Sequence, residues 1–166
     1  ARGAAVEGMK RPRECLGLVR VNAEDTEFCE GDLGAVVGPW LDGIILPKVE
    51  TAAQLLSVDK LIQGFEQGQG MEPGGIDLLP IIETAKGVNS VTDIAGCGSR
   101  AGRLSFGAVD LAKDLGMRLT EDEWELTPLR SAIVLASVER IDRLKERLRA
   151  RPLLPCDPLD PQKAYV

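Results

Sequence analysis

Four short apolar runs divide the chain, and each run ends in a polar or charged residue. They predict strands over about residues 16–22, 43–49, 77–83 and 103–109. Between one run and the next, apolar residues recur at helical spacing. A strand followed by a helix, repeated along the chain, indicates a parallel sheet, because parallel neighbours need a long crossover connection. The predicted fold class is therefore α/β.

The residues that end these runs are not those that an inert core would contain. They are Arg20, Asn22, Lys48, Glu83 and Asp110. In parallel α/β proteins the binding site lies beyond the carboxyl ends of the strands. We therefore expect these five side chains to border a functional site.

Within each predicted strand, alternate residues share a face. The face that ends in one of the polar residues is apolar before it. The four sets are Leu18, Arg20 and Asn22; Ile44, Leu46 and Lys48; Leu79, Ile81 and Glu83; and Leu104, Phe106, Ala108 and Asp110. An interior that is packed with apolar side chains and becomes polar at its rim is typical of a barrel of parallel strands.

Two of the rim residues, Glu83 and Asp110, are expected to approach each other from neighbouring strands. Unpaired carboxylates repel, so one of them must take up a proton or a cation must lie between them. Mg²⁺ suits this position, because it favours one or two carboxylates together with waters and substrate oxygens. Arg20 has the planar group that can bind a substrate carboxylate through two hydrogen bonds.

Each of these residues also has an interpretation without a binding site. Glu83 and Asp110 each precede or begin a predicted helix, where a carboxylate interacts favourably with the helix dipole. Arg20 could form a salt bridge with one of these acids. For Lys48, an ion pair with Glu50 or a side chain that extends along the surface is the better interpretation.

Composition narrows the class of protein and of partner. The chain has 166 residues, 44% hydrophobic and 28% charged, which is ordinary for a globular domain. We expect one domain over residues 1–150 and an irregular, proline-rich tail over 151–166. The net charge of −6 argues against a nucleic-acid partner. No run approaches the roughly 20 apolar residues that span a bilayer, and no signal peptide is visible, so the expected location is cytoplasmic.

The absence of histidine and the wide spacing of the cysteines exclude several kinds of catalytic and metal site. The chain has no histidine, which removes Ser-His-Asp and Cys-His catalysis and histidine-ligated zinc. Its four cysteines lack C-x-x-C spacing and are predicted to be free thiols. They are Cys15, Cys29, Cys97 and Cys156.

Two glycine-rich segments, 64–75 and 96–101, are interpreted as connectors. The second fits the dinucleotide-binding pattern G-x-G-x-x-A. That pattern is meaningful only after a strand and before a helix, whereas both segments are expected to follow a helix and precede a strand.

The same residues carry a resemblance to a known family. The motifs are VRVN, ILPKVE, LLPIIETAKGV with DIA, and RLSFGAVDLAKDLG, followed by RSAIVLAS. In this order, over residues 1–137, they resemble the citrate lyase beta subunit-like family of the HpcH/HpaI aldolase group. The resemblance implies a (β/α)8 TIM barrel that acts as a carbon–carbon lyase or aldolase. It also implies an acyl-CoA thioester of the citryl-, malyl- or citramalyl-CoA type, or a keto acid, as substrate, and an enolate stabilised on Mg²⁺.

The resemblance also implies roles for individual residues. Glu83 of the IET motif and Asp110 of the FG-x-x-D motif match the metal ligands. Arg20 of the VRVN motif matches the arginine that binds the substrate carboxylate and polarises its carbonyl. Asn22 and Lys48, at the same rim, are the candidates for further substrate contacts, and a homo-oligomer is expected.

The sequence departs from this family at both ends. An earlier strand with a D-L-E-D motif and a later H-P-x-Q segment are absent, and a charged helical pattern over 138–149 stands where the family has another strand. A full barrel typically needs about 250 residues. We therefore expect an incomplete barrel that corresponds to the middle of the fold. Two hypotheses follow: a lyase whose isolated fragment is inactive or feeble, or a non-catalytic half-barrel whose exposed strand edges serve binding or assembly.

Overall fold

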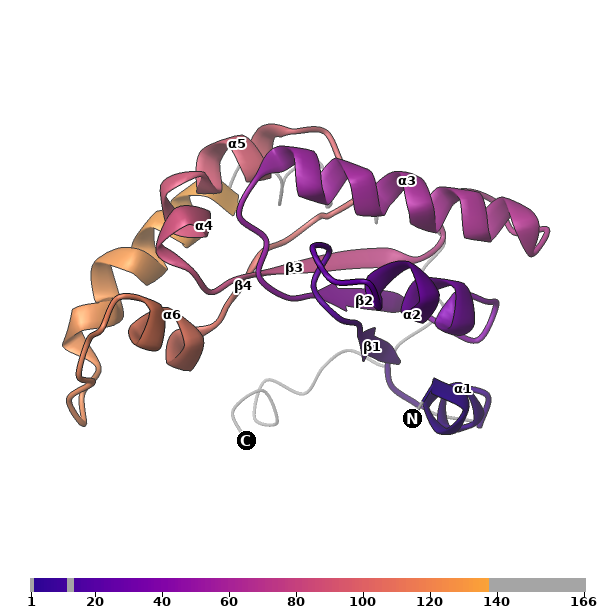
Figure 1. Ribbon diagram of the computed structural model, residues 1–166, viewed down its shortest axis with the longest axis horizontal. Helices are drawn as coiled ribbons and strands as arrows, with labels where there is room; N and C mark the ends of the chain where they lie inside the picture. Colours follow the sequence, from indigo (N-terminus) through magenta and orange to yellow (C-terminus); the bar gives the residue numbers. More distant parts are fainter. Residues whose placement is uncertain (1, 12–13, 138–166) are drawn as a thin grey trace, which may run out of the picture.

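The computed structural model describes residues 2–11 and 14–137 of the chain (Figure 1). The charged helical pattern over 138–149, the tail over 151–166 and Cys156 lie outside the described residues. The domain boundary expected at residue 150 lies outside them too and stays a prediction.

Four parallel strands form one sheet, in which the order of the strands follows the order of the chain. They are β1 (Leu18–Arg20), β2 (Gly43–Leu46), β3 (Asp77–Ile82) and β4 (Ser105–Phe106). Each lies inside one of the four predicted runs, and all three pairings are parallel. The predicted α/β class with alternating helices is confirmed.

The strands are shorter than the apolar runs that predicted them. After β2 the chain leaves the sheet at Pro47, which has no N–H to donate to a neighbouring strand. Lys48 follows with a positive φ of 52°, a conformation that interrupts extended backbone. The functional end of this run is therefore a loop and not the last residues of a strand.

Helices precede, connect and follow the strands. They are α1 (Arg2–Met9), α2 (Cys29–Val36), α3 (Ala52–Gly68), α4 (Ala85–Asn89), α5 (Val91–Gly96), α6 (Ala108–Asp114), the short 3-10 helix η1 (Trp124–Leu126) and a helix over 127–137. Thr51 begins α3 with a capping box, because its hydroxyl accepts from the Gln54 amide and the Gln54 side chain accepts from the Thr51 amide. Helix α3 contacts both α2 and α5.

The two faces of the sheet differ in burial. Ile44 pairs with Leu78, and these residues, together with Leu46 and Ile82, are fully buried in the core that α2, α3 and α5 share with the sheet. Figure 1 shows α3 and α5 along the same side of the sheet. The opposite face has half-buried apolar residues, which are Leu18, Ile45, Leu79 and Ile81. We call these four residues the inner face.

The register corrects part of the predicted alternation. Arg20 pairs with Ile45, and Ile45 pairs with Leu79, so Arg20 does share a face with Leu79. The sets predicted for the second and fourth runs are wrong, because Ile44 and Phe106 lie on the helix-covered face. Both runs have apolar residues at consecutive positions, and such a pattern does not indicate which residues face which side.

A buried ion cluster joins the two glycine-rich connectors. Glu66, with no exposed surface, accepts hydrogen bonds from the amides of Gly74 and Ile76 (2.9 and 3.0 Å). The guanidinium of Arg100, whose side chain is 7% exposed, donates to Glu66 at 2.8 Å and to Asp59 at 2.6 Å. Both connectors follow a helix and precede a strand, as predicted. The cluster lies at the amino end of β3, which begins one residue after Ile76.

No helix within residues 2–11 and 14–137 combines the length and the apolar character that crossing a bilayer requires.

Candidate functional site

The candidate site is at the carboxyl ends of the strands, where Glu83 directly follows β3. Glu83 is 4% exposed, and its Oε1 accepts a hydrogen bond from the backbone N–H of Lys48 at 2.9 Å. Thr84 caps α4 through a hydrogen bond from the Gly87 amide at 3.1 Å. The carboxylate of Glu83 is thus bound by the loop after β2, and Thr84 has the helix-capping role.

Gly107 makes room for Glu83 from the neighbouring strand. Its amide donates to the Ile82 carbonyl at 3.0 Å, which places it beside Glu83. A Cβ atom at residue 107 would lie 2.5 Å from the Cβ and 2.7 Å from Oε2 of Glu83. Only glycine therefore fits at this position without displacing the acid.

Asp110 is in the first turn of α6, just after Gly107. Helix α6 is bonded to the start of α4 through Asp114, whose Oδ2 accepts from the amide of Ala85 at 2.8 Å. Residue 85 begins α4, two positions after Glu83. This contact brings the helix that carries Asp110 next to the segment that carries Glu83.

The charge of Glu83 interacts with the charges of Asp110 and Arg20. Burial raises the pKa of Glu83 above its ordinary value, against a hydrogen bond from the Lys48 amide that lowers it. The nearby carboxyl group of Asp110 raises the pKa of Glu83 further, while the positive charge of Arg20 lowers it. The structure therefore brings together the three residues expected to do the chemistry.

Arg20 ends β1, and its side chain is exposed. The next residue, Val21, is buried and donates its amide to the Ile45 carbonyl at 3.1 Å, which extends the pairing past the strand's end. Within the part of the chain that the structure describes, Arg20 has no salt bridge with either acid. Its guanidinium is available to a ligand that carries a carboxylate.

The other two expected site residues have different surroundings. Lys48 contributes its backbone amide, while its side chain is exposed. The ion pair suggested between Lys48 and Glu50 is not formed, because Glu50 pairs with Lys86 at 3.1 Å. The Asn22 side chain donates to Oδ2 of Asp32 at 2.6 Å, so its amide group is already engaged within the protein.

Sequence reasoning missed Asp32 and the spatial role of Gly107. A glycine immediately after an apolar run, as in Phe106-Gly107, is a signal of close approach that could have been used. Nothing in the pattern distinguishes Asp32 from the other acids between residues 24 and 32.

The donor set fits a hard divalent cation. Mg²⁺ favours one or two carboxylates completed by waters and substrate oxygens, and Glu83 and Asp110 supply two carboxylates. Among the described residues there is no group of three or more His, Cys, Asp or Glu side chains that could hold a metal ion. The described residues therefore offer a pair of carboxylates and not a cage of three or more acidic ligands.

Thiol chemistry is not part of this site. Cys29 and Cys97 are free, as predicted. Burial, together with the negative charges of Glu24 and Asp32 and other nearby acids, raises the pKa of Cys29 to about 11. At neutral pH this thiol is protonated and is a poor nucleophile.

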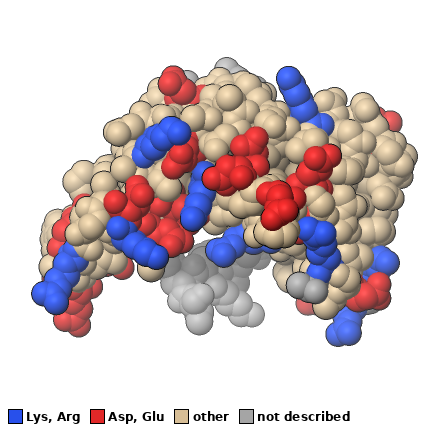
Figure 2. Space-filling view, viewed as in Figure 1, with Lys and Arg blue, Asp and Glu red and all other residues tan. Residues whose placement is uncertain are grey.

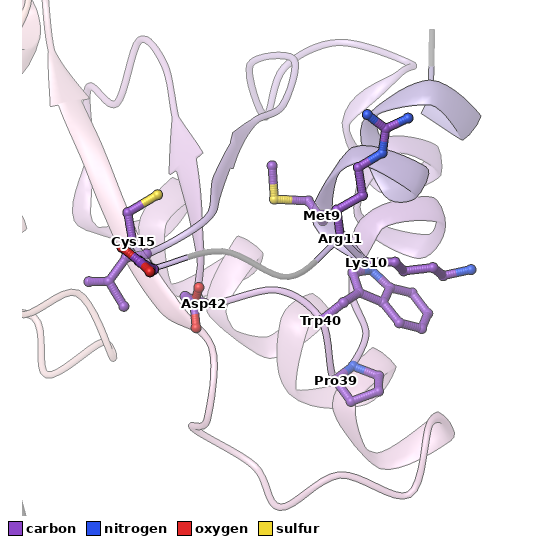
Figure 3. Close-up of a pocket in the computed structure, with 9 residues that line it drawn as sticks. Met9, Lys10, Arg11, Cys15, Pro39, Trp40 and Asp42 are labelled. Carbon is purple, nitrogen blue, oxygen red and sulfur yellow. The ribbon is translucent and has the colours of Figure 1, made fainter. Parts of the chain in front are cut away.

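Charges of both signs are interspersed on the face of the molecule shown in Figure 2. A hollow of about 560 Å³ lies elsewhere, at the amino ends of β1 and β2, beside Leu16 and Asp42 (Figure 3). At the margin of this hollow, the ammonium of Lys10 lies 4.8 Å from the centre of the Trp40 ring. This hollow and the candidate site are therefore at opposite ends of the sheet.

Comparisons with known proteins find similar sequences and similar structures. The model of the HpcH/HpaI aldolase/citrate lyase family matches residues 5–142. The citrate lyase subunit beta of Escherichia coli (strain K12) is 34% identical over 139 residues, which cover 82% of this chain and 46% of that protein. An L-malyl-CoA/beta-methylmalyl-CoA lyase of Cereibacter sphaeroides (strain ATCC 17029 / ATH 2.4.9) is 36% identical over 120 residues, covering 70% of this chain and 37% of the relative.

Among solved structures, one similar to this chain is the citrate lyase beta subunit from M. tuberculosis in complex with oxaloacetate and magnesium. Its TM-score is 0.57 with 26% identity, over 80% of this chain and 59% of that one. The described strands and helices thus form part of a (β/α)8 barrel fold. The chain spans about half the length of the relatives it matches.

Proposed function

This chain belongs to the HpcH/HpaI aldolase/citrate lyase family, and from this premise we propose that its site serves a carbon–carbon lyase or aldolase reaction. The proposed substrate is an acyl-CoA thioester of the citryl-, malyl- or citramalyl-CoA type, or a keto acid. The names of the relatives support this class, since they include a malyl-CoA lyase and a protein in complex with oxaloacetate. The observation that carries the proposal is the buried Glu83 at the carboxyl end of β3, held by the Lys48 amide and packed against Gly107, with Asp110 in the first turn of the helix that follows.

In this proposal Glu83 and Asp110 hold Mg²⁺. The bound ion would supply positive charge where negative charge develops on the substrate carbonyl oxygen. Glu83 is prepared for this role by the Lys48 amide, which fixes Oε1, and by the space that Gly107 leaves beside Oε2. Arg20 would bind a substrate carboxylate by paired hydrogen bonds and so orient the carbonyl group toward the two acids.

A Mg²⁺ titration by calorimetry tests the site directly. We expect Mg²⁺ binding to the wild-type chain, and Glu83→Gln should weaken it by roughly tenfold or more, since one of two anionic ligands is lost. Glu72→Gln is the matched control, because Glu72 is an exposed acid near the amino end of β3. If Glu83→Gln and Glu72→Gln bind Mg²⁺ equally well, the assignment of the metal ligands is wrong.

Activity is tested by the cleavage of citryl-CoA, malyl-CoA and citramalyl-CoA with Mg²⁺ and with EDTA. In this chain we expect at most feeble turnover, and any turnover should disappear with EDTA. Robust turnover in EDTA would exclude the metal role.

A second candidate function is a non-catalytic half-barrel that binds or assembles with another chain. The half-buried inner face and the two outer strands favour it, since within the described residues β1 pairs only with β2 and β4 pairs only with β3. Such edges can pair with a further strand. For either function, we also propose that the chain forms a homo-oligomer and lies in the cytoplasm.

A further inference from the structure

Asp32 of α2 is bonded to the segment that directly follows Arg20. Its Oδ2 accepts from the backbone N–H of Asn22 at 3.0 Å and from the Asn22 side-chain amide at 2.6 Å. Its Oδ1 accepts from Nε of Arg2 at 2.6 Å. The Asp32 side chain is only 13% exposed, whereas the Arg2 side chain is 47% exposed.

Helix α2 is a rigid platform for this carboxylate. Leu33 and Val36 of α2 are buried in the core, with 0% and 3% of their surface exposed. Burial disfavours the charge of Asp32, but hydrogen bonds from Arg2 and from both donors of Asn22 keep its pKa below the ordinary value. Asp32 is therefore ionised at neutral pH, and its two bonds to Asn22 are charge-assisted.

Strand β1 needs such an anchor more than the central strands do. It has three residues and, among the described residues, one neighbouring strand. Beyond Arg20, its path is fixed by the pairing of Val21 with Ile45 and by the two bonds from Asn22 to Asp32. The pairing with Ile45 holds one side of the backbone at Val21. The hydrogen bonds to Asp32 hold Asn22, two positions after Arg20.

We propose that Asp32 is a positioning residue of the site, which acts through Asn22 to fix the end of β1 and thereby the guanidinium of Arg20. The inference rests on the proposed function, since the ligand oriented in this way is the substrate carboxylate. It also assigns Asn22 a different role from the one expected, because its side chain transmits the position of α2 to β1 and does not bind substrate.

The first measurement is calorimetric titration of the 166-residue chain with oxaloacetate in the presence of Mg²⁺. Asp32→Ala should weaken oxaloacetate binding by roughly tenfold to a hundredfold, the range seen when a residue that orients a ligand is removed. Mg²⁺ binding should be unchanged, because Glu83 and Asp110 are untouched. Arg2→Ala is the matched control: it removes the exposed partner of Asp32 and leaves both bonds to Asn22.

The second measurement separates positioning from a general loss of structure. In an Arg20→Ala background, Asp32→Ala should have no further effect on oxaloacetate affinity, because the group that it positions is gone. An undiminished effect of Asp32→Ala in that background would overturn the proposal. Should Asp32→Ala fail to fold, Asn22→Ala, which removes the 2.6 Å bond, takes its place with the same expected pattern.

A wild-type chain that binds Mg²⁺ but not oxaloacetate would refute the proposed substrate class. The positioning role would then be decided by NMR of the Arg20 Nε–H and backbone amide signals. In Asp32→Ala these signals should shift or broaden while the Lys48 amide signal stays in place. Unchanged Arg20 signals would overturn the inference independently of any ligand.

Discussion

At the scale of single residues, the candidate site is shaped by backbone groups as much as by side chains. Glu83 is positioned by the amide of Lys48 and by the missing side chain of Gly107. The acids and Arg20 were predictable from the sequence because they stand at the ends of apolar runs. Their backbone partners were not, since a hydrogen bond from an amide can come from almost any residue type.

Gly107→Ala should damage the site through lack of space. The added methyl group would lie 2.5 Å from Cβ of Glu83, so Glu83 or the backbone must move. We expect a loss of about 1–3 kcal/mol of unfolding free energy in urea, together with weaker Mg²⁺ binding. Gly64→Ala is the control, because nothing lies within 4 Å of a Cβ there and alanine is favoured within α3. Equal stability of the two variants would contradict the close packing at Gly107.

Substitutions of Lys48 test its left-handed backbone. With φ at 52°, Lys48→Gly should be more stable than Lys48→Ala by about 1 kcal/mol, because glycine adopts this conformation without strain. In an ordinary extended or helical position the order would be reversed. Urea unfolding measures the difference, and both variants should still bind Mg²⁺ because the amide remains. A more stable Lys48→Ala would show that the backbone at residue 48 is not left-handed.

At the scale of elements, the strands and their parallel order were predictable, whereas their facing and their tertiary contacts were not. Apolar runs that alternate with segments of helical periodicity indicate a parallel sheet, whichever side of the sheet each residue faces. The side of the sheet that Ile44 faces depends on register, which only pairing with β3 fixes. The bond between Glu66 and Arg100 joins residues 34 positions apart, and no local pattern indicates it.

The ion cluster around Glu66 should make stability depend on pH. Burial opposes the charge of Glu66, but hydrogen bonds from Arg100, Gly74 and Ile76 lower its pKa in the folded state. A lowered folded pKa stabilises the protein above the unfolded pKa, about 4.3, and this contribution is lost as the pH falls through the folded pKa. We expect the urea midpoint of the wild type to fall steeply below about pH 5.

Glu66→Gln should remove part of that dependence and lower stability at pH 7 by about 3 kcal/mol, because it leaves Arg100 buried with only Asp59 as an acidic partner. Urea titrations at a series of pH values measure both effects. The exposed Glu72→Gln should reproduce the wild-type curve. If the stability of Glu66→Gln changed with pH in parallel with that of the wild type, Glu66 would not contribute to the loss of stability at acid pH.

At the scale of the whole molecule, the inner face decides how the chain behaves in solution. Its four apolar side chains are half-buried, and exposed apolar surface of this kind favours association. We expect sizing chromatography with light scattering to report concentration-dependent self-association. Leu79→Lys on the inner face should weaken it, whereas Gln63→Lys, at an exposed polar position of α3, should not. A wild-type chain that is monomeric at every concentration would refute the homo-oligomer.

The ion cluster and the acidic pair stand at opposite ends of β3, roughly 20 Å apart at the rise of an extended strand. Residues this distant and without a shared partner change folding free energy additively. Laboratory evolution could therefore vary the loops around Glu83 for new substrates while Glu66 and Arg100 keep the scaffold intact. Substitutions near Glu83 would not weaken the ion cluster, because losses of stability at the two ends are additive. A library of variants restricted to the carboxyl ends of the strands should therefore retain a high proportion of folded members.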